Sequence, residues 1–446
     1  MCNDVIWGIF MKSDAELKQY VISAVESRRQ QIIELAEKIL HNPELGYREE
    51  KTAALVAAEL EKLELTVRTQ LAITGVRADI SSGRPGPKIA IMGELDALPV
   101  PSHAFADPET GAAHACGHHA QLAMMLGAAQ ALVPIVKELS GSLAFIAVPA
   151  EEFQSLEYCR GLISSGKISY CGGKPEFIKQ GFLDDIDAVL LIHAGHDTFT
   201  PESFNGFCMK QIVFEGKAAH GGLRPWDGVN AASMARQALN MIDAQRDTFD
   251  DKDSVRIHGI ISDGGNAVNV VPARAELELQ VRAKTPEAVK NACAVVDRCV
   301  RGAAMAFKGK VSIANLGGYM PYKSCPELNA VHAENLKLLN GGILTNFGHR
   351  GSSTDMGDVS MLMPALHAYC AGFTGSPHAK DFVVIDPEKA YIDGAKLLAM
   401  DAVSLLCGNA EKGKEIAGLP KIMDKETYFK YKETFTSIEE YDYDKA

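Results

Sequence analysis

The chain has 446 residues, of which 47% are hydrophobic, so it is long enough to bury more than one core and two domains are the natural expectation. Its formal net charge is -12, with 45 basic and 57 acidic side chains. Nucleic-acid binding needs clustered lysine and arginine, so this balance argues against a nucleic-acid surface and favours an acidic enzyme that acts on small molecules. Ten cysteines without framework spacing indicate reduced thiols and a cytoplasmic protein.

The N-terminal segment carries an apolar patch over residues 5–11 that follows Asp4 and lacks a preceding basic stretch. The patch is too short to span a membrane or to act as an ordinary signal peptide. We therefore expect no membrane contact, and Met11 is a second possible start of the protein.

Helices and buried strands alternate over the first 200 residues. Helical periodicity covers 16–40 and 48–63, a third helix begins near His118, and short apolar strands are expected at 88–92, 143–148 and 188–192. An order of strand, helix and strand is typical of an α/β fold with a mostly parallel sheet covered by helices.

The pattern changes from about Gly206. Strands are expected at 209–215, 255–261 and 275–282, with helices at 231–242 and 286–305. This order predicts a ferredoxin-like α+β insertion, in which two helices cover one face of a small antiparallel sheet. Helices at 328–339 and 387–406 and a strand at 365–371 then return to the first pattern.

These patterns predict two domains. Residues 1–206 and 317–446 are expected to form one α/β domain, and 207–316 a lid domain inserted into it. The tail after Gly408 is rich in Lys, Glu and Tyr, and we expect either a peripheral helix or partial disorder there.

One short segment concentrates metal ligands. The run from His114 to Ala120 contains Cys116, His118 and His119, which gives one thiol and three imidazoles within six residues. Thiolate and neutral imidazole are the groups that bind zinc and its neighbours. Since the segment leads into a helix N-terminus, the helix dipole favours the thiolate form of the cysteine.

Polar side chains also follow three of the predicted strands. Asp96, the pair Glu151 and Glu152, and His193 stand at these strand ends, where open α/β sheets bind their ligands. Neighbouring side chains on extended backbone point in opposite directions, so one glutamate can bind a metal while the other acts as general base. Taken singly, each feature also has an ordinary interpretation, such as a turn at Asp96 or a solvated Glu-Glu pair.

The motifs together resemble those of a known family. They are Glu-Leu-Asp-Ala-Leu-Pro from 94, His-Ala-Cys-Gly-His from 114, Pro-Ala-Glu-Glu from 149, the strand end at His193, Gly-Lys-Ala-Ala-His from 216, Asn-Val-Val-Pro from 269 and Gly-Ser-Pro-His from 375. In order and spacing, from about Leu40 to Leu406, they resemble the metal-dependent amidohydrolase and carboxypeptidase family. That family includes aminoacylases, glutamate carboxypeptidases, auxin-conjugate hydrolases and aminobenzoyl-glutamate hydrolase.

The resemblance implies roles for ten residues. It implies that each subunit binds two divalent metals, which could be zinc, manganese, cobalt or nickel. The implied ligands are Cys116, His118, Glu152, His193 and His378. Glu151 is implied as the general base, and Asp96 as the carboxylate that orients a ligand. In the lid, substrate binding and carbonyl polarisation are implied for His220, Asn269 and Arg282. The lid is also implied to form a homodimer interface.

The reaction implied by this resemblance is hydrolysis of the amide bond of an N-acyl or aroyl amino acid, or of a small dipeptide, by metal-activated water. A thiol hydrolase with Cys116 as nucleophile and a non-catalytic metal-binding protein on the same fold remain as alternatives. A zinc deaminase is disfavoured because its Pro-Cys-x-x-Cys element is missing. Two departures from the family stand out: His119, where many relatives carry Asp or Asn, and a longer segment between Glu152 and His193.

Overall fold

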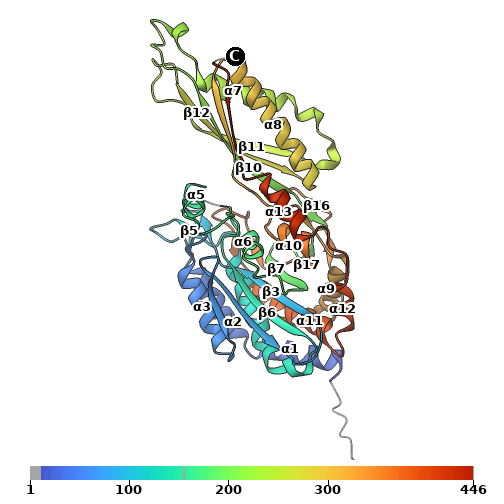
Figure 1. Cartoon of the computed structure of the whole chain (residues 1–446). Coiled ribbons are helices and arrows are strands. Elements are labelled where there is room, and N and C mark those ends of the chain that lie inside the picture. Colours follow the sequence, from blue (N-terminus) through green and yellow to red (C-terminus); the bar gives the residue numbers. More distant parts are fainter. Residues whose placement is uncertain (1–11, 154–155, 445–446) are drawn as a thin grey trace, which may run out of the picture. The chain divides into compact units, whose positions relative to one another are not determined.

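The computed structural model describes residues 12–153 and 156–444, and it divides into two compact units (Figure 1). The first unit contains the residues up to Pro201, Ser324–Phe347 and Met363–Lys421. The second contains Glu202–Lys323, Gly348–Leu362 and the residues from Ile422 onward. The apolar patch predicted at 5–11 lies outside the described residues.

The first unit is built on an eight-stranded sheet with the strand order β1-β2-β6-β3-β7-β17-β8-β15. Its strands are β1 Val67–Leu71, β2 Gly75–Ser81, β3 Lys88–Glu94, β6 Ser142–Val148, β7 Ala188–Ala194, β8 Phe199–Thr200, β15 Thr345–Asn346 and β17 Ala365–Cys370. The four central strands β6, β3, β7 and β17 are parallel to one another, and β2 joins them antiparallel. The mostly parallel sheet predicted from the sequence is therefore confirmed.

Helices cover this sheet, and two short ribbons lie beside it. The helices are α1 Asp14–Glu26, α2 Arg29–Leu40, α3 Glu50–Glu61, α4 His118–Leu132, α5 Leu156–Ser164, α6 Gly173–Lys179, α9 Pro326–Asn340, α11 Gly394–Leu406 and α12 Glu411–Ala417. The ribbons pair β4 Leu98–Pro99 with β5 Ala112–Ala113, and β18 Phe373–Thr374 with β19 Val383–Val384.

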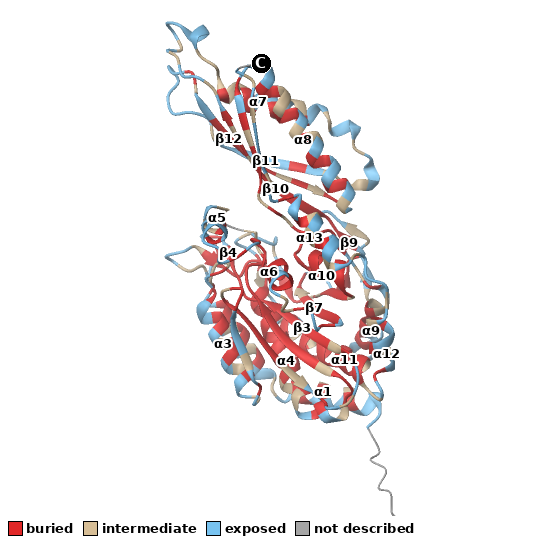
Figure 2. Cartoon of the chain, in the orientation of Figure 1, coloured by how far each residue is buried: buried red, intermediate tan, exposed pale blue. Residues whose placement is uncertain are grey.

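The α4 helix forms the centre of the first core. All of its residues except Gln130 are buried, and it packs against α1, α2, α11 and the strands β3 and β7 (Figure 2). Among the described residues, His118–Glu138 is the one helical segment long and apolar enough to cross a membrane, and 83% of its most apolar window is buried inside the protein. Such burial is typical of a core helix.

The prediction of one continuous helix over 16–40 is wrong, because the chain breaks between α1 and α2. Ser27 Oγ and Arg28 Nη1 both donate hydrogen bonds to the carbonyl oxygen of Ala24, at 2.9 and 3.1 Å. Arg28 leaves the helical region with φ -109° and ψ 8°. Side chains that bond to a nearby carbonyl compete with the helical ladder, so the two helices end and begin there.

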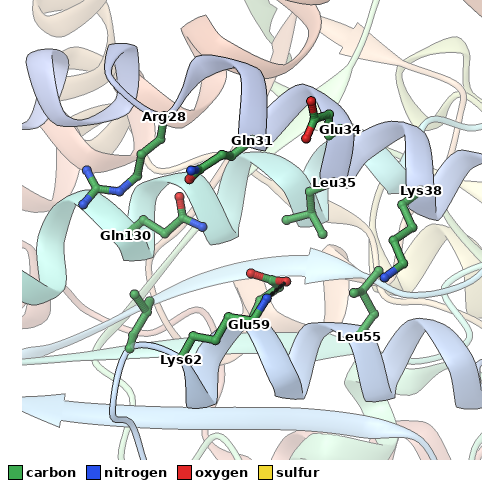
Figure 3. Close-up of a pocket in the computed structure, with 10 residues that line it drawn as sticks. Arg28, Gln31, Glu34, Leu35, Lys38, Leu55, Glu59, Lys62 and Gln130 are labelled. Atoms are coloured by element: carbon green, nitrogen blue, oxygen red, sulfur yellow. Dashed lines mark hydrogen bonds and ion pairs between the residues drawn. The ribbon is translucent and has the colours of Figure 1, made fainter.

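A surface pocket of about 490 Å³ lies among α2, α3 and α4 of this unit (Figure 3). Its charged lining residues are of both signs: Arg28, Glu34, Lys38, Glu59 and Lys62. None of the predicted site residues lines it, so we assign it no role.

The second unit contains a five-stranded antiparallel sheet with the order β11-β12-β10-β13-β20. Its elements are β10 Gly206–Glu215, α7 Ala231–Ala244, β11 Arg256–Asp263, β12 Arg274–Ala283, α8 Pro286–Ala306, β13 Lys310–Asn315 and β20 Ile438–Asp442. Side chains alternate between buried and less buried positions along β10 and β12, and the buried ones join those of α7 and α8 in one core. Two helices on one face of an antiparallel sheet confirm the predicted α+β fold of this region (Figure 1).

The predicted boundary at 317–446 differs from the division in the structure. Residues 348–362 and those after 421 group with the second unit. The unit also contains α10 Met356–Leu362, α13 Lys425–Glu433 and a small sheet of β14 Tyr322–Lys323, β9 Ser203–Phe204 and β16 His349–Arg350. The tail after Gly408 thus forms helices, of which α12 is buried only at Gly413 and Ile416, and its last strand pairs with β13.

A buried ion pair holds this C-terminal segment. Asp358 Oδ1 accepts hydrogen bonds from Tyr428 Oη at 2.7 Å and from Lys432 Nζ at 2.8 Å, and its Oδ2 accepts one from the Met320 amide at 3.1 Å. Asp358 is fully buried and Lys432 is 3% exposed. Composition did not reveal this contact because charged residues at a chain end are usually solvated.

We expect the substitution Asp358→Ala to lower the free energy of unfolding by about 3–5 kcal/mol, because it leaves the buried Lys432 ammonium without its partner carboxylate. Urea denaturation measures the loss. The matched control is Asp442→Ala, which removes the exposed pair between Asp442 and Lys310 Nζ at 2.9 Å and is expected to cost less than about 1 kcal/mol. Equal losses in the two variants would contradict this account of the tail.

Candidate metal centre

Three adjacent parallel strands bring the predicted site residues of the first unit to one edge of the sheet. Since β6, β3 and β7 are neighbours and run in the same direction, their carboxyl ends lie side by side. The Leu95 amide donates to the Val148 carbonyl oxygen at 2.9 Å, which extends this pairing to the positions just before Asp96 and Glu151.

The side chains form three overlapping groups of possible metal ligands. Within each group the ligand atoms lie within 4.8 Å of one another. The groups are Cys116, His118 and His193; Cys116, Glu152 and His378; and Glu94, His118 and Glu151. All five predicted ligands occur in these groups, and Cys116 belongs to two of the three.

The sharp turn at Gly117 places Cys116 and His118. Gly117 is the N-cap of α4 and has φ 90°, a left-handed conformation that favours glycine. A Cβ atom at this position would lie 2.3 Å from the Cβ of Ala194 at the end of β7. The glycine therefore allows the ligand loop to approach the strand that carries His193.

Asp96 fixes two of the proposed ligands. Its Oδ1 lies 3.2 Å from His118 Nδ1, and its carbonyl oxygen lies 2.8 Å from the same nitrogen. Its Oδ2 accepts a hydrogen bond from the Glu152 amide at 2.9 Å. With Nδ1 engaged, His118 turns its Nε2 toward the cluster, which is the orienting role that a carboxylate plays behind a metal-binding histidine.

His193 and His378 complete the cluster from two other segments. His193 Nδ1 lies 2.9 Å from the Ala194 carbonyl oxygen, and its Nε2 lies 3.6 Å from Cys116 Sγ. His378 Nε2 lies 3.1 Å from Glu152 Oε1. His378 has φ 66°, an uncommon conformation for a residue other than glycine, and strain of this kind concentrates at functional sites.

The centre attracts positive charge. Burial and the Glu152 carboxylate oppose ionisation of the Cys116 thiol, but His118 and His193 lower its pKa to about 6. Hydrogen bonds to Cys116 and Glu152 raise the pKa of His378 to about 11. Burial opposes protonation of His118 and His193, yet the nearby Cys116 and Glu94 charges raise the pKa of both imidazoles. The anionic groups thus retain protons on the imidazoles, and a metal would displace them.

These residues fit a divalent metal. His118 Nε2 is buried, and among residues 12–153 and 156–444 it makes no hydrogen bond, although it lies 3.1 Å from the carboxylate oxygen Oε2 of Glu94. A thiolate, imidazole nitrogens and a carboxylate are a donor set for zinc and other first-row metals. Metal ligation would explain why a buried imidazole nitrogen makes no hydrogen bond and lies near a thiol of low pKa.

Sequence reasoning did not assign Glu94, Gln121 and Lys174 to the site. Glu94 is fully buried; its Oε2 accepts from Gln121 Nε2 at 2.7 Å and lies 3.1 Å from His118 Nε2. Its Oε1 accepts from Lys174 Nζ. Lys174 comes from the longer segment between Glu152 and His193. A lone lysine in this segment carries no signal for the contact in the sequence.

Glu49 is a second residue that sequence reasoning missed. Its Oε1 accepts a hydrogen bond from the Ala150 amide at 2.8 Å, and its Oε2 accepts one from Thr74 Oγ1 at 2.6 Å. Burial and the nearby Asp96 raise the pKa of Glu49 to about 8. Glu49 thereby supports Ala150, which has φ 49° immediately before Glu151.

His119 lies outside the three ligand groups. Its Nε2 lies 3.3 Å from Tyr391 Oη, and its ring lies 5.4 Å from that of His114. Both histidines line a pocket of about 180 Å³ that is also lined by Phe105, Phe373 and other residues. Burial is the main cause that lowers the pKa of His119 to about 3, so its imidazole is neutral. The departure from Asp or Asn at this position therefore adds no ligand to the three groups.

The three predicted substrate-binding residues belong to the second unit. His220 and Asn269 are both exposed on facing segments, joined by the bridge between His220 and Val270. Arg282 is half-buried on β12, where its Nη1 donates to Ser353 Oγ at 3.1 Å and its Nε donates to Gln280 Oε1 at 2.9 Å. Burial lowers the pKa of this guanidinium from its ordinary value.

Known proteins resemble the chain in sequence and fold. Residues 204–305 match the family model described as the M20 peptidase dimerisation domain. An IAA-amino acid hydrolase, ILR1-like 2, from Arabidopsis thaliana is 32% identical over 267 residues, which cover 57% of this chain and 56% of that protein. The Xaa-Arg dipeptidase of Mus musculus is 26% identical over 416 residues, which cover 87% of this chain and 89% of that protein.

One solved structure is that of the YXEP protein of Bacillus subtilis, described as a dinuclear metal binding peptidase from the M20 family. It matches with a TM-score of 0.65 and 21% identity, over 85% of this chain and 99% of that chain. At this identity the likeness concerns the fold. Residues 204–305 thus resemble a peptidase dimerisation domain, and the chain resembles an amino-acid-conjugate hydrolase and a dipeptidase in sequence and an M20-family peptidase in fold.

Proposed function

We propose that the protein is a metal-dependent amidohydrolase that cleaves the amide bond of N-acyl or aroyl amino acids, or of small dipeptides. One observation carries the proposal: the ligand atoms of Cys116, His118, Glu152, His193 and His378 converge in overlapping groups, beside Glu151. The names of the relatives, a hydrolase of amino-acid conjugates and a dipeptidase, support the substrate class.

In this proposal Cys116, His118, Glu152, His193 and His378 hold two divalent metals, drawn from zinc, manganese, cobalt and nickel. When bound, such a metal lowers the pKa of water toward about 7. Glu151 Oε2, which lies 4.0 Å from His118 Nε2, accepts the proton of the attacking water and returns it to the leaving nitrogen. Asp96 keeps His118 oriented throughout.

His220, Asn269 and Arg282 are proposed to bind the substrate. The guanidinium of Arg282 has five N–H donors, and the amide of Asn269 has two, so both suit a free carboxylate. His220 is proposed to donate a hydrogen bond to the scissile carbonyl oxygen as negative charge develops on it. These roles are supported by the resemblance of the surrounding motifs to those of the known family.

The proposed assembly is a homodimer formed through the second unit. The match of 204–305 to a peptidase dimerisation domain supports it. A cytoplasmic location is supported by the nine cysteines of the described residues, which are reduced thiols. The acidic net charge supports small-molecule substrates rather than nucleic acid or a membrane surface.

The thiol-hydrolase alternative is not favoured. Cys116 has a low pKa and lies beside His193, as a nucleophile would, but it also belongs to two of the three ligand groups. One solved structure with a similar fold is described as a dinuclear metal binding peptidase, and this supports metal ligation by Cys116 instead of nucleophilic attack. The non-catalytic alternative is not favoured either, because Glu151 and every proposed ligand are present.

The substitution Glu151→Gln is expected to lower kcat by about 100- to 10,000-fold with metal content unchanged, because it removes the general base but leaves the ligands in place. Glu152→Gln is expected to lower metal content. The measurement is hydrolysis of N-acetyl, N-benzoyl and aminobenzoyl amino acids and dipeptides by metal-free protein refilled with each metal. Glu157→Gln, an exposed acid on α5, is the control. Parental turnover by Glu151→Gln would refute the base assignment.

Removal of the metal by a chelator is expected to abolish hydrolysis, and one or more of the four metals to restore it. Cys116→Ala is expected to retain less metal per chain, as measured by elemental analysis. A thiol enzyme would survive chelation and lose activity to a thiol-alkylating reagent instead. Full activity of the metal-free protein would therefore exclude the proposed function.

The substitution Arg282→Met is expected to raise KM for N-acyl amino acids by about 10- to 100-fold, the value of one charge-assisted hydrogen bond. The same change is expected to leave KM for the corresponding amino-acid amides nearly unchanged, since these have no free carboxylate. Arg256→Met is the matched control, because Arg256 faces Arg282 on the neighbouring strand β11 and is exposed. Equal effects on acids and amides would rule out carboxylate binding by Arg282.

A further inference from the structure

Lys174 is an unusual neighbour for a proposed metal centre. Its side chain is completely buried, and its Nζ donates a hydrogen bond to Oε1 of the equally buried Glu94. A buried ammonium beside cation-binding side chains competes with any metal for the same anionic groups.

The chain positions Lys174 through a close backbone approach. The Gly173 amide donates to the Ala150 carbonyl oxygen at 3.1 Å, and a Cβ atom at Gly173 would lie 1.7 Å from the carbonyl oxygen of Pro149. The start of α6 is thus packed against the segment that ends in Glu151. Only a glycine allows this approach, and it places the next side chain beside Glu94.

Glu94 belongs to the third group of possible ligands, with His118 and Glu151. This group differs from the two groups that contain Cys116, because it has two carboxylates and no sulfur. Its imidazole nitrogen, His118 Nε2, is buried and lies 3.1 Å from Glu94 Oε2 and 4.0 Å from Glu151 Oε2. Carboxylate-rich groups suit hard cations such as Mn²⁺, whereas thiolate and imidazole suit Zn²⁺.

We propose that Lys174 is a metal-selectivity residue, whose ammonium group takes the place of a divalent cation at Glu94 and so excludes Glu94 from the ligand set. Lys174 occupies Glu94 Oε1, while Gln121 donates to Oε2. The centre is thereby restricted to the groups that contain Cys116, which favour zinc-like metals. This inference rests on the metal centre of the proposed function.

The test compares the metals bound by wild type, Lys174→Met and Lys174→Gln. Each metal-free protein is dialysed to equilibrium against equal concentrations of Mn²⁺ and Zn²⁺, and bound metal is measured by elemental analysis. Both substitutions remove the charge, and we expect the ratio of bound Mn²⁺ to Zn²⁺ to rise about 10-fold as Glu94 becomes a ligand. Lys174→Gln retains an amide donor for Glu94, so it carries the test where Lys174→Met does not fold.

Two further variants isolate the cause. The double variant Glu94→Gln/Lys174→Met removes the carboxylate as well as the ammonium, and we expect the wild-type ratio to return. Lys210→Met removes a second buried lysine, which pairs with Asp297 at 2.8 Å in the other unit, and we expect no change in the ratio. This variant shows whether the loss of any buried lysine changes the ratio of bound Mn²⁺ to Zn²⁺.

A wild-type ratio in both Lys174→Met and Lys174→Gln overturns the selectivity role. So does an increase that persists in the double variant, because Glu94 would then not be its cause. Failure of the proposed function is distinguishable, since wild-type protein would then bind neither metal at the centre.

Discussion

Anionic groups buried at the carboxyl ends of β3 and β6 are the constraint on which the first unit depends. Glu94 ends β3 and Asp96 follows it, Glu151 and Glu152 follow the adjacent strand β6, and Cys116 adds a thiol of low pKa. Buried carboxylates require nearby cations or hydrogen-bond donors. The histidines, Lys174 and backbone amides supply these, and divalent metals would supply more.

The surrounding structure is arranged to hold these groups at short range. The left-handed turn at Gly117, the uncommon backbone of His378 and the support of Ala150 by Glu49 each bring a ligand-bearing segment closer than ordinary packing would. Unfavourable local conformations of this kind persist only where the rest of the fold overdetermines them. The mostly buried α4 and the parallel strands provide that rigid support.

Lys174 connects the unusual length of the segment after Glu152 with the chemistry of the site. In the second unit, too, a buried charge fixes a segment of the chain. Its C-terminal strand β20 and the buried pair of Asp358 and Lys432 tie the end of the chain to a sheet whose other strands lie between 206 and 315.

Periodicity and residue type were sufficient to predict the parallel sheet and the antiparallel insertion, because buried strands and amphipathic helices are marked by local patterns. The five proposed ligands were instead implied by the resemblance of the motifs to a known family. The break at Ser27 and Arg28, the docking of the tail and the contacts of Glu49, Glu94 and Lys174 were not predictable. Each of these depends on a partner far along the chain or on a backbone turn that no local pattern encodes. Residue types at the strand ends thus indicate which chemistry is available, and long-range packing establishes which of those side chains meet.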